Sequence, residues 1–233
     1  MRSPGRRLAG CTLALAALLA APGCASRGLT AGEAALLGSL HGASLDAPAV
    51  RLTEAPIVGA FPIAYDARPR TTCRERIAPP RIGRVETRAA GIALFDRILL
   101  SPAVALPDFA AVSEGGLDLS SAMFLAHEAT HVWQWQNRAR TGYSPLRAFT
   151  EQLRADDPYL FALDGRPFLD HGYEQQASLV EEYLCCATLD PEGARTARLH
   201  ALLSPALPVA PPAAFPRDVI LPWDGAELEG ICA

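Results

Sequence analysis

Hydrophobic positions recur with helical spacing near the start of the chain. In residues 31–41 three leucines fall on one face, which is the pattern of an amphipathic helix. Thr30 and Glu33 have the spacing of a capping box at its start. Gly42 follows the last apolar position, so the pattern predicts a short helix that ends there.

The most extended helical pattern lies within residues 114–142. Asp118, Ser120 or Ser121 can cap its start, and Gly142 suits its end. Further helices are predicted at residues 144–155, 173–189 and, more weakly, 191–203.

Alternating or β-branched segments predict a small number of strands. They occupy residues 49–55, 84–102 and 218–223. The middle segment predicts two or three strands that turn near Asp96. Residues 56–83 are rich in Pro, Arg and Thr and are expected to be irregular, as are the loop or hairpin at 157–172 and the extended stretch 204–216. This set of elements predicts an α+β fold.

The first residues have the pattern of an export signal. Three arginines without an acid precede an apolar run of about a dozen residues, which is too short to span a membrane. We therefore predict a signal peptide at residues 1–23. The residues ending at Cys24 resemble a lipobox, which predicts an acylated Cys24 as the new N-terminus. A similar box at Cys11 and ordinary cleavage after Ala25 are the alternatives. The expected location is the periplasm or the outer membrane of a bacterium, with membrane attachment through a lipid on Cys24.

Composition limits the remaining possibilities. The chain has 233 residues, half of them apolar, which is enough for one domain with its own core. We place this domain at residues 28–203 and expect residues 204–233 to pack on it as a Pro-rich extension. A net charge of −4 without a basic run argues against nucleic acid as a partner.

Four cysteines lie beyond the signal segment: Cys73, Cys185, Cys186 and Cys232. Disulfides are common in exported proteins, and neighbouring cysteines seldom pair with each other. If bridges form, Cys73 and Cys232 each take one of the adjacent pair. Free buried thiols are the alternative.

The candidate chemistry lies in the segment His-Glu-Ala-Thr-His at residues 127–131. On a helix, His127 and His131 are one turn apart on the same face, so both imidazoles can bind one Zn²⁺ ion. Glu128 points to another side and can reach a water molecule at that ion, as the general base of a metallopeptidase does. The same five residues could also occur by chance in an ordinary buried helix. Their apolar surroundings favour the metal site, because unpartnered buried His and Glu are costly.

A third ligand must come from elsewhere in the chain. The extended motif that supplies a third histidine is absent, so a carboxylate from a later helix is expected. The candidates are Glu151, Asp156, Asp157, Asp170, Glu174, Glu181 and Glu182. Glu174 is preferred because it begins a helix whose apolar residues can pack on the first. Glu181 or Glu182 could accept a hydrogen bond from a ligand histidine, although both are expected to face water.

The combination of "HEATH" with the later "EQQAS" resembles the gluzincins, in which a glutamate on a second helix completes the site. More narrowly, "HEATHVWQWQ", "YEQQA" and "AAGIALFDRILLSP" resemble bacterial Vgr-related (Rhs-element Vgr) proteins and small metallopeptidase-like domains of the DUF4157 type. The resemblance implies a zincin-like, mostly helical core with a small antiparallel sheet beside the motif helix. It also implies His127, His131 and Glu174 as zinc ligands and Glu128 as the base. Position 178 departs from the pattern, since it holds Ser where related sequences often have an acid.

Together these features predict an exported zinc metallopeptidase that acts on a peptide or protein substrate. A zinc-activated water would attack the peptide bond, with His171, Tyr173 or Tyr143 as candidate donors to the oxyanion. One alternative is a lipid-anchored binding or assembly protein that keeps the fold and the zinc but does not cleave. The other is a cysteine-bridged structural domain in which the motif is a coincidence.

Overall fold

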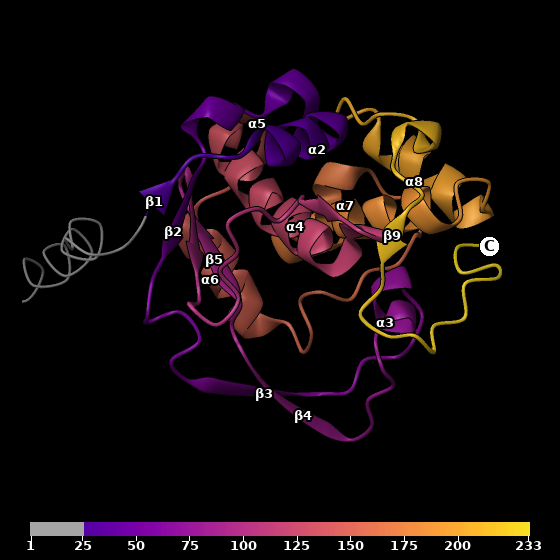
Figure 1. The fold of residues 1–233 in the computed structure, drawn as a ribbon. Coiled ribbons are helices and arrows are strands. Elements are labelled where there is room, and N and C mark those ends of the chain that lie inside the picture. Colours follow the sequence, from indigo (N-terminus) through magenta and orange to yellow (C-terminus); the bar gives the residue numbers. More distant parts are fainter. Residues whose placement is uncertain (1–25) are drawn as a thin grey trace, which may run out of the picture.

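The protein is an α+β domain, described by a computed structural model for residues 26–233 (Figure 1). The expected signal segment 1–23 and Cys24 lie outside the described residues. The helices in this range are α2 (Ala31–His41), α3 (Cys73–Ile77), α4 (Leu119–Gln136), α5 (Arg138–Thr141), α6 (Pro145–Arg154), α7 (Tyr173–Leu189) and α8 (Ala194–Leu203). None of the helices in the described range is long and apolar enough to cross a membrane.

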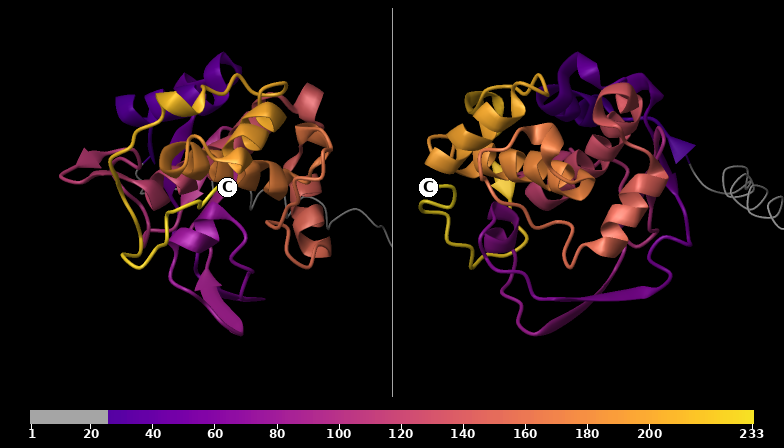
Figure 2. Two further views of the ribbon diagram at one scale, coloured as in Figure 1. Left: turned by 90° about the vertical axis from the view of Figure 1, so that its right-hand side faces the viewer. Right: turned by 180° about the vertical axis from the view of Figure 1, so that it is seen from behind.

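The strands form three small sheets. They are β1 (Ser26–Arg27), β2 (Arg51–Glu54), β3 (Pro62–Asp66), β4 (Arg84–Arg88), β5 (Gly91–Leu94), β6 (Arg97–Leu100), β7 (Val112–Ser113), β8 (Gly116–Asp118) and β9 (Val219–Ile220). The largest sheet has the order β1-β2-β6-β5, the second is the β3–β4 ribbon, and the third has the order β7-β8-β9. Figure 2 shows the β3–β4 ribbon at the margin of the molecule in both views.

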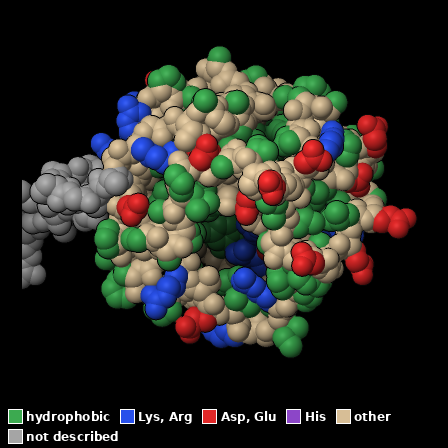
Figure 3. Space-filling view, viewed as in Figure 1, with side chains coloured by type: hydrophobic (Ala, Val, Ile, Leu, Met, Phe, Trp, Pro, Cys, Tyr) green, Lys and Arg blue, Asp and Glu red, His purple; other side chains and the backbone are tan. Residues whose placement is uncertain are grey.

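The expectation of a purely antiparallel sheet is wrong for the largest sheet, which is mixed. Its strands β2 and β6 run parallel, while β5 and β6 form the antiparallel hairpin predicted near Asp96. A parallel pair requires a long connection, and the chain provides one between Glu54 and Arg97. This connection contains β3 and α3, so the prediction that residues 56–83 are irregular is wrong in part. It also contains β4 and β5, which lie in the segment 84–102 where strands were predicted. Figure 3 shows the molecule from the same side as Figure 1. This face has a hollow near its centre, with arginine side chains in it.

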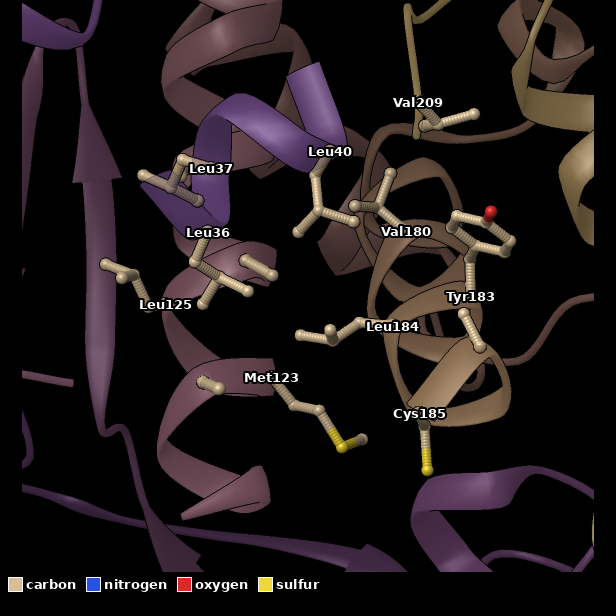
Figure 4. Packing of buried hydrophobic residues seen from close by; sticks show 14 of the residues in the cluster. Leu36, Leu37, Leu40, Met123, Leu125, Val180, Tyr183, Leu184, Cys185 and Val209 are labelled. Atoms are coloured by element: carbon tan, nitrogen blue, oxygen red, sulfur yellow. The ribbon is translucent and has the colours of Figure 1, made fainter. Parts of the chain in front are cut away.

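Helices α4 and α7 form the centre of the core. Asp118, one of the three candidate caps in the sequence, caps α4 by accepting a hydrogen bond from the Ser121 backbone. Both helices are buried on more than one side, which is the pattern of helices enclosed by other elements. Leucines of α2 pack over them, next to Met123 of α4 and Leu184 of α7 (Figure 4). The predicted capping box of α2, Thr30 with Glu33, is also present.

The β5–β6 hairpin lies directly against α4. A Cβ atom on Gly91 would be 2.8 Å from Cζ of Phe124 and 3.1 Å from Cδ of Glu128, so any other residue here would force these side chains to shift. At the turn of the hairpin, the Phe95 ring packs edge-on against Trp135 with 4.7 Å between ring centroids. The hairpin therefore brings strand β5, an edge of the sheet, beside the middle of α4.

Two disulfides join distant segments to α7. They connect Cys73 with Cys185 and Cys186 with Cys232, so each outer cysteine pairs with one of the adjacent two, as expected if bridges form. The first bridge attaches α3 and the second attaches the C-terminal segment. Residues 204–233 also contact the helices through Tyr183, whose hydroxyl donates to the Ala210 carbonyl, and through β9, which pairs with β8.

His41 is completely buried between α2 and α4, where its Nε2 lies 3.0 Å from the Thr130 hydroxyl. Burial lowers the pKa of His41 to about 4, because the interior disfavours the charged ring. The unfolded chain binds a proton near pH 6.5, whereas the folded chain binds it only near pH 4, so stability is lost as the pH falls through this window.

We predict that chelator-treated protein loses roughly 3 kcal/mol of unfolding free energy through His41 between pH 6.5 and pH 4. Urea unfolding at both pH values measures this loss. The His41→Gln variant should show a pH dependence that is smaller by about this amount. An unchanged pH dependence in the variant would show that His41 titrates in the same way in both states.

Candidate metal centre

Helix α4 holds His127 and His131 one turn apart on the same buried face. Their ring centroids are 5.1 Å apart, and the ring planes stand at 77° to each other. Both side chains are buried by the packing of α4 against α7, yet 6–7% of each residue's surface remains exposed. The pair is therefore deep in the protein without being sealed from solvent.

Glu174, in the first turn of α7, reaches both imidazoles. Its Oε2 atom lies 3.2 Å from Nε2 of His127 and 3.3 Å from Nε2 of His131. One ligand atom from each of the three residues lies within 4.8 Å of the other two. The structure thus brings together the three residues that the sequence analysis selected from different parts of the chain.

The hydrogen bonds of the Gln134 amide determine which nitrogen of His131 carries a proton. The Gln134 Nε2 atom donates to the Tyr173 carbonyl at 3.0 Å, which fixes the orientation of the amide. Its Oε1 atom then faces Nδ1 of His131 at 2.9 Å and can only accept. His131 must therefore carry a proton on Nδ1, and Nε2 is the atom that faces Glu174, with a lone pair whenever the ring is neutral.

His127 has the same tautomer for a related reason. Its Nδ1 atom lies 3.2 Å from Oε2 of Glu181, which also accepts a hydrogen bond from Arg74 at 3.0 Å. Burial alone would raise the pKa of Glu181, but the positive charge of Arg74 and the contact with His127 outweigh it and lower this pKa. An ionised carboxylate can only accept, so His127 donates from Nδ1 and presents the lone pair of Nε2.

Two lone pairs and a carboxylate oxygen therefore point at one another, and this arrangement repels unless a proton or a cation lies between them. Burial lowers the pKa of His127, but hydrogen bonds to Glu174 and Glu181 reverse the effect and raise it to about 10. Burial would raise the pKa of Glu174, yet the positive charge of His131 and the hydrogen bonds from both rings hold it well below its usual range. These residues fit a divalent cation, which would satisfy all three groups at once.

Glu128 lies beside the cluster and is not part of it. Burial raises the pKa of its carboxyl group, although the positive charges of His127 and His131 oppose this shift. Among the described residues, its Oε2 atom has no hydrogen-bond partner. A buried carboxylate oxygen without a partner is costly, so this atom is available to a water molecule or a substrate.

The other acids that could have been ligands have different partners. Glu181 supports His127, and Glu182 accepts from the Cys73 backbone at 2.8 Å and from Arg195 at 2.6 Å. The expectation that both face water is wrong, because α7 is buried on this side as well. Glu151 accepts from the Tyr173 backbone, and Asp157 pairs with Arg68.

Of the three residues expected as oxyanion donors, Tyr143 lies beside His131, Tyr173 contacts Tyr143, and His171 lies elsewhere. The Tyr143 ring is 6.4 Å from that of His131, and burial together with the charges of Glu174 and Glu128 raises the pKa of its hydroxyl. Tyr173 packs edge-on against Tyr143. His171 lines a separate cavity of about 650 Å³, whose lining contains none of the three candidate ligands.

Tyr159 was not among the residues expected at the centre. Its ring centroid lies 5.7 Å from that of His127 and 4.7 Å from Cζ of Arg68, whose guanidinium lies over the ring. It comes from an irregular loop, where no periodicity marks the side chains that turn inward.

Comparison with known proteins gives one distant structural similarity. The chain resembles the effector domain of Pseudomonas aeruginosa VgrG2b with 22% sequence identity and a TM-score of 0.48. The alignment covers 82% of this chain and 90% of that domain. No family model matches the sequence, and no curated protein matches it. The neighbour bears the Vgr name, as do the proteins that the sequence resembles, but a similarity of this degree does not assign a function.

We predict that Gln134→Leu lowers the unfolding free energy of the metal-free protein by about 1–3 kcal/mol, because the variant leaves buried hydrogen-bonding groups of His131, Tyr173 and Gln176 unpaired. Urea denaturation measures the loss. Gln136→Leu is the matched control on the same helix, since the hydrogen bonds of Gln136 lie nearer the surface and can be replaced by water. Equal losses in the two variants would contradict a special role for the Gln134 amide.

Proposed function

We propose that this protein is an exported zinc metallopeptidase, with one Zn²⁺ held by His127, His131 and Glu174. The observation that carries the proposal is the convergence of two Nε2 lone pairs on a buried carboxylate oxygen at 3.2 and 3.3 Å. Two imidazoles and one carboxylate are a ligand set of catalytic zinc sites, in which a fourth position stays open.

The chemistry of the set favours zinc over harder cations. Calcium and magnesium prefer six or more oxygen ligands, whereas this cluster offers two nitrogen atoms and one carboxylate. Both histidines donate their other nitrogen to a fixed acceptor, an arrangement that orients metal-binding imidazoles and increases their basicity. When bound, zinc would act as a Lewis acid and bring the pKa of a water molecule near 7.

Glu128 is the proposed general base. It lies on the same helix as the two histidines, and its Oε2 atom is buried without a hydrogen-bond partner among the described residues. Burial raises the pKa of this carboxyl group, which improves its ability to accept a proton from the attacking water near neutral pH. The same group then donates the proton to the leaving amine as the peptide bond breaks. Tyr143, close to His131, is the proposed donor to the oxyanion.

The fold and the bridges support this proposal in two ways. The edge strand β5 lies beside the proposed base, as expected for a zincin-like core. Two disulfides suit an oxidising compartment, in agreement with the signal segment and the lipid attachment proposed at Cys24.

We predict about one zinc ion per chain in protein purified without chelators, and none in the His127→Ala variant, which loses one of three ligands. Metal analysis by mass spectrometry measures the content. Gln136→Ala changes a residue of the same helix outside the centre and should keep the ion. A wild-type chain that purifies without zinc and does not take it up would refute the proposed centre.

We predict that Glu128→Gln keeps the zinc content of the wild type and lowers peptide cleavage by at least about 100-fold, because amide groups do not accept the proton. Digestion of a mixed peptide pool, followed by mass spectrometry, detects the products. Equal cleavage by the variant would exclude Glu128 as the base. Zinc binding without cleavage by the wild type would favour the alternative, a lipid-anchored binding protein.

A further inference from the structure

One oxygen atom connects an arginine to a proposed zinc ligand. Oε2 of Glu181 lies 3.0 Å from Nη1 of Arg74 and 3.2 Å from Nδ1 of His127. The Glu181 carboxylate is buried, so its position depends on these partners. The orientation of the His127 ring is therefore linked to a residue on α3.

Each of the three side-chain nitrogen atoms of Arg74 already has a carboxylate partner. Its Nη1 atom is paired with Glu181, while Nε and Nη2 both approach Oε1 of Glu75 at 3.3 Å. An arginine that recognises substrate would direct its planar fork toward open space. These contacts favour a role in holding Glu181.

Helix α3 has only five residues, and a helix of this length does not persist without tertiary contacts. The Cys73–Cys185 disulfide provides such a contact immediately before Arg74. On α7, Cys185 follows Glu181 by four residues, so both lie on the same face. The bridge consequently fixes the α3 backbone one helical turn from the carboxylate that Arg74 contacts.

We propose that Arg74 is a positioning residue for the metal centre and that the Cys73–Cys185 disulfide holds it against Glu181. The chain with this bridge binds zinc more tightly than a chain without it. This inference rests on the proposed zinc centre. If Arg74 is removed, the buried Glu181 loses its cationic partner and takes another orientation, so His127 is no longer fixed with Nε2 toward the metal.

A double-mutant cycle tests the connection. Zinc dissociation constants of the full chain are measured by competition with a chromophoric chelator. Arg74→Ala and Glu181→Gln should each weaken binding by about 10-fold, and the double variant should bind no more weakly than Glu181→Gln alone. Arg74→Lys, which restores the charge, should stay within about threefold of the wild type. Wild-type affinity in Arg74→Ala, or additive losses in the double variant, would overturn the positioning role.

The second disulfide provides a matched control for the first. The Cys73→Ser/Cys185→Ser variant should bind zinc about 10-fold more weakly, whereas Cys186→Ser/Cys232→Ser should stay within about threefold of the wild type. Equal losses would overturn the role of the first bridge, because they would reflect general loosening. Failure of only the first variant to fold would also overturn it, since the bridge would then serve the whole fold. A wild type without zinc affinity would instead refute the proposed function itself.

Discussion

The rest of the structure depends on three buried groups, His127, His131 and Glu174, which repel one another unless a proton or a cation lies between them. Gln134 and Glu181 each occupy the Nδ1 side of one histidine, so both rings direct an Nε2 lone pair at a carboxylate oxygen of Glu174. In water these side chains would move apart, but the packing of α4 on α7 holds them close together. The free protein relieves the conflict with protons, which is why the pKa of His127 rises to about 10. A divalent cation relieves it without protons, and its binding is therefore coupled to proton release.

Strand β5 and helix α3 contact the two helices that carry the centre. The hairpin of β5 and β6 meets α4 at Gly91, where the absence of a side chain leaves room for Glu128. On the other side, α3 approaches α7 through a disulfide and contributes the arginine that faces Glu181. The centre is thus assembled from two helices, a glycine in an edge strand and a short tethered helix. The two helices supply the ligands, the glycine leaves space for the base, and the short helix orients the ligand His127.

Local signals in the sequence predicted the starts of α2 and α4 but not the short helix α3. The capping box of α2 and the Asp118 cap of α4 satisfy backbone groups within a few residues, so their effect is independent of the rest of the fold. Glu174 could be selected because it begins a helix able to pack on α4. The orientation of Glu181 and Glu182 could not, since α7 is enclosed on several sides and its polar residues pair with arginines from α3 and α8. The parallel pairing of β2 with β6 and the inward turn of Tyr159 also depend on contacts between distant segments. Position 178 holds Ser, and the carboxylate that contacts His127 comes from Glu181, three residues later.

Anomalous diffraction at the zinc absorption edge tests the central claim most directly. Crystals of the zinc-loaded chain should show one strong anomalous peak about 2.0–2.1 Å from Nε2 of both His127 and His131, with a Glu174 oxygen atom at a similar distance. Both Nδ1 atoms should keep their contacts with Gln134 and Glu181. An ion that is bound through Nδ1 of either histidine, or a peak that lies away from Glu174, would contradict the account.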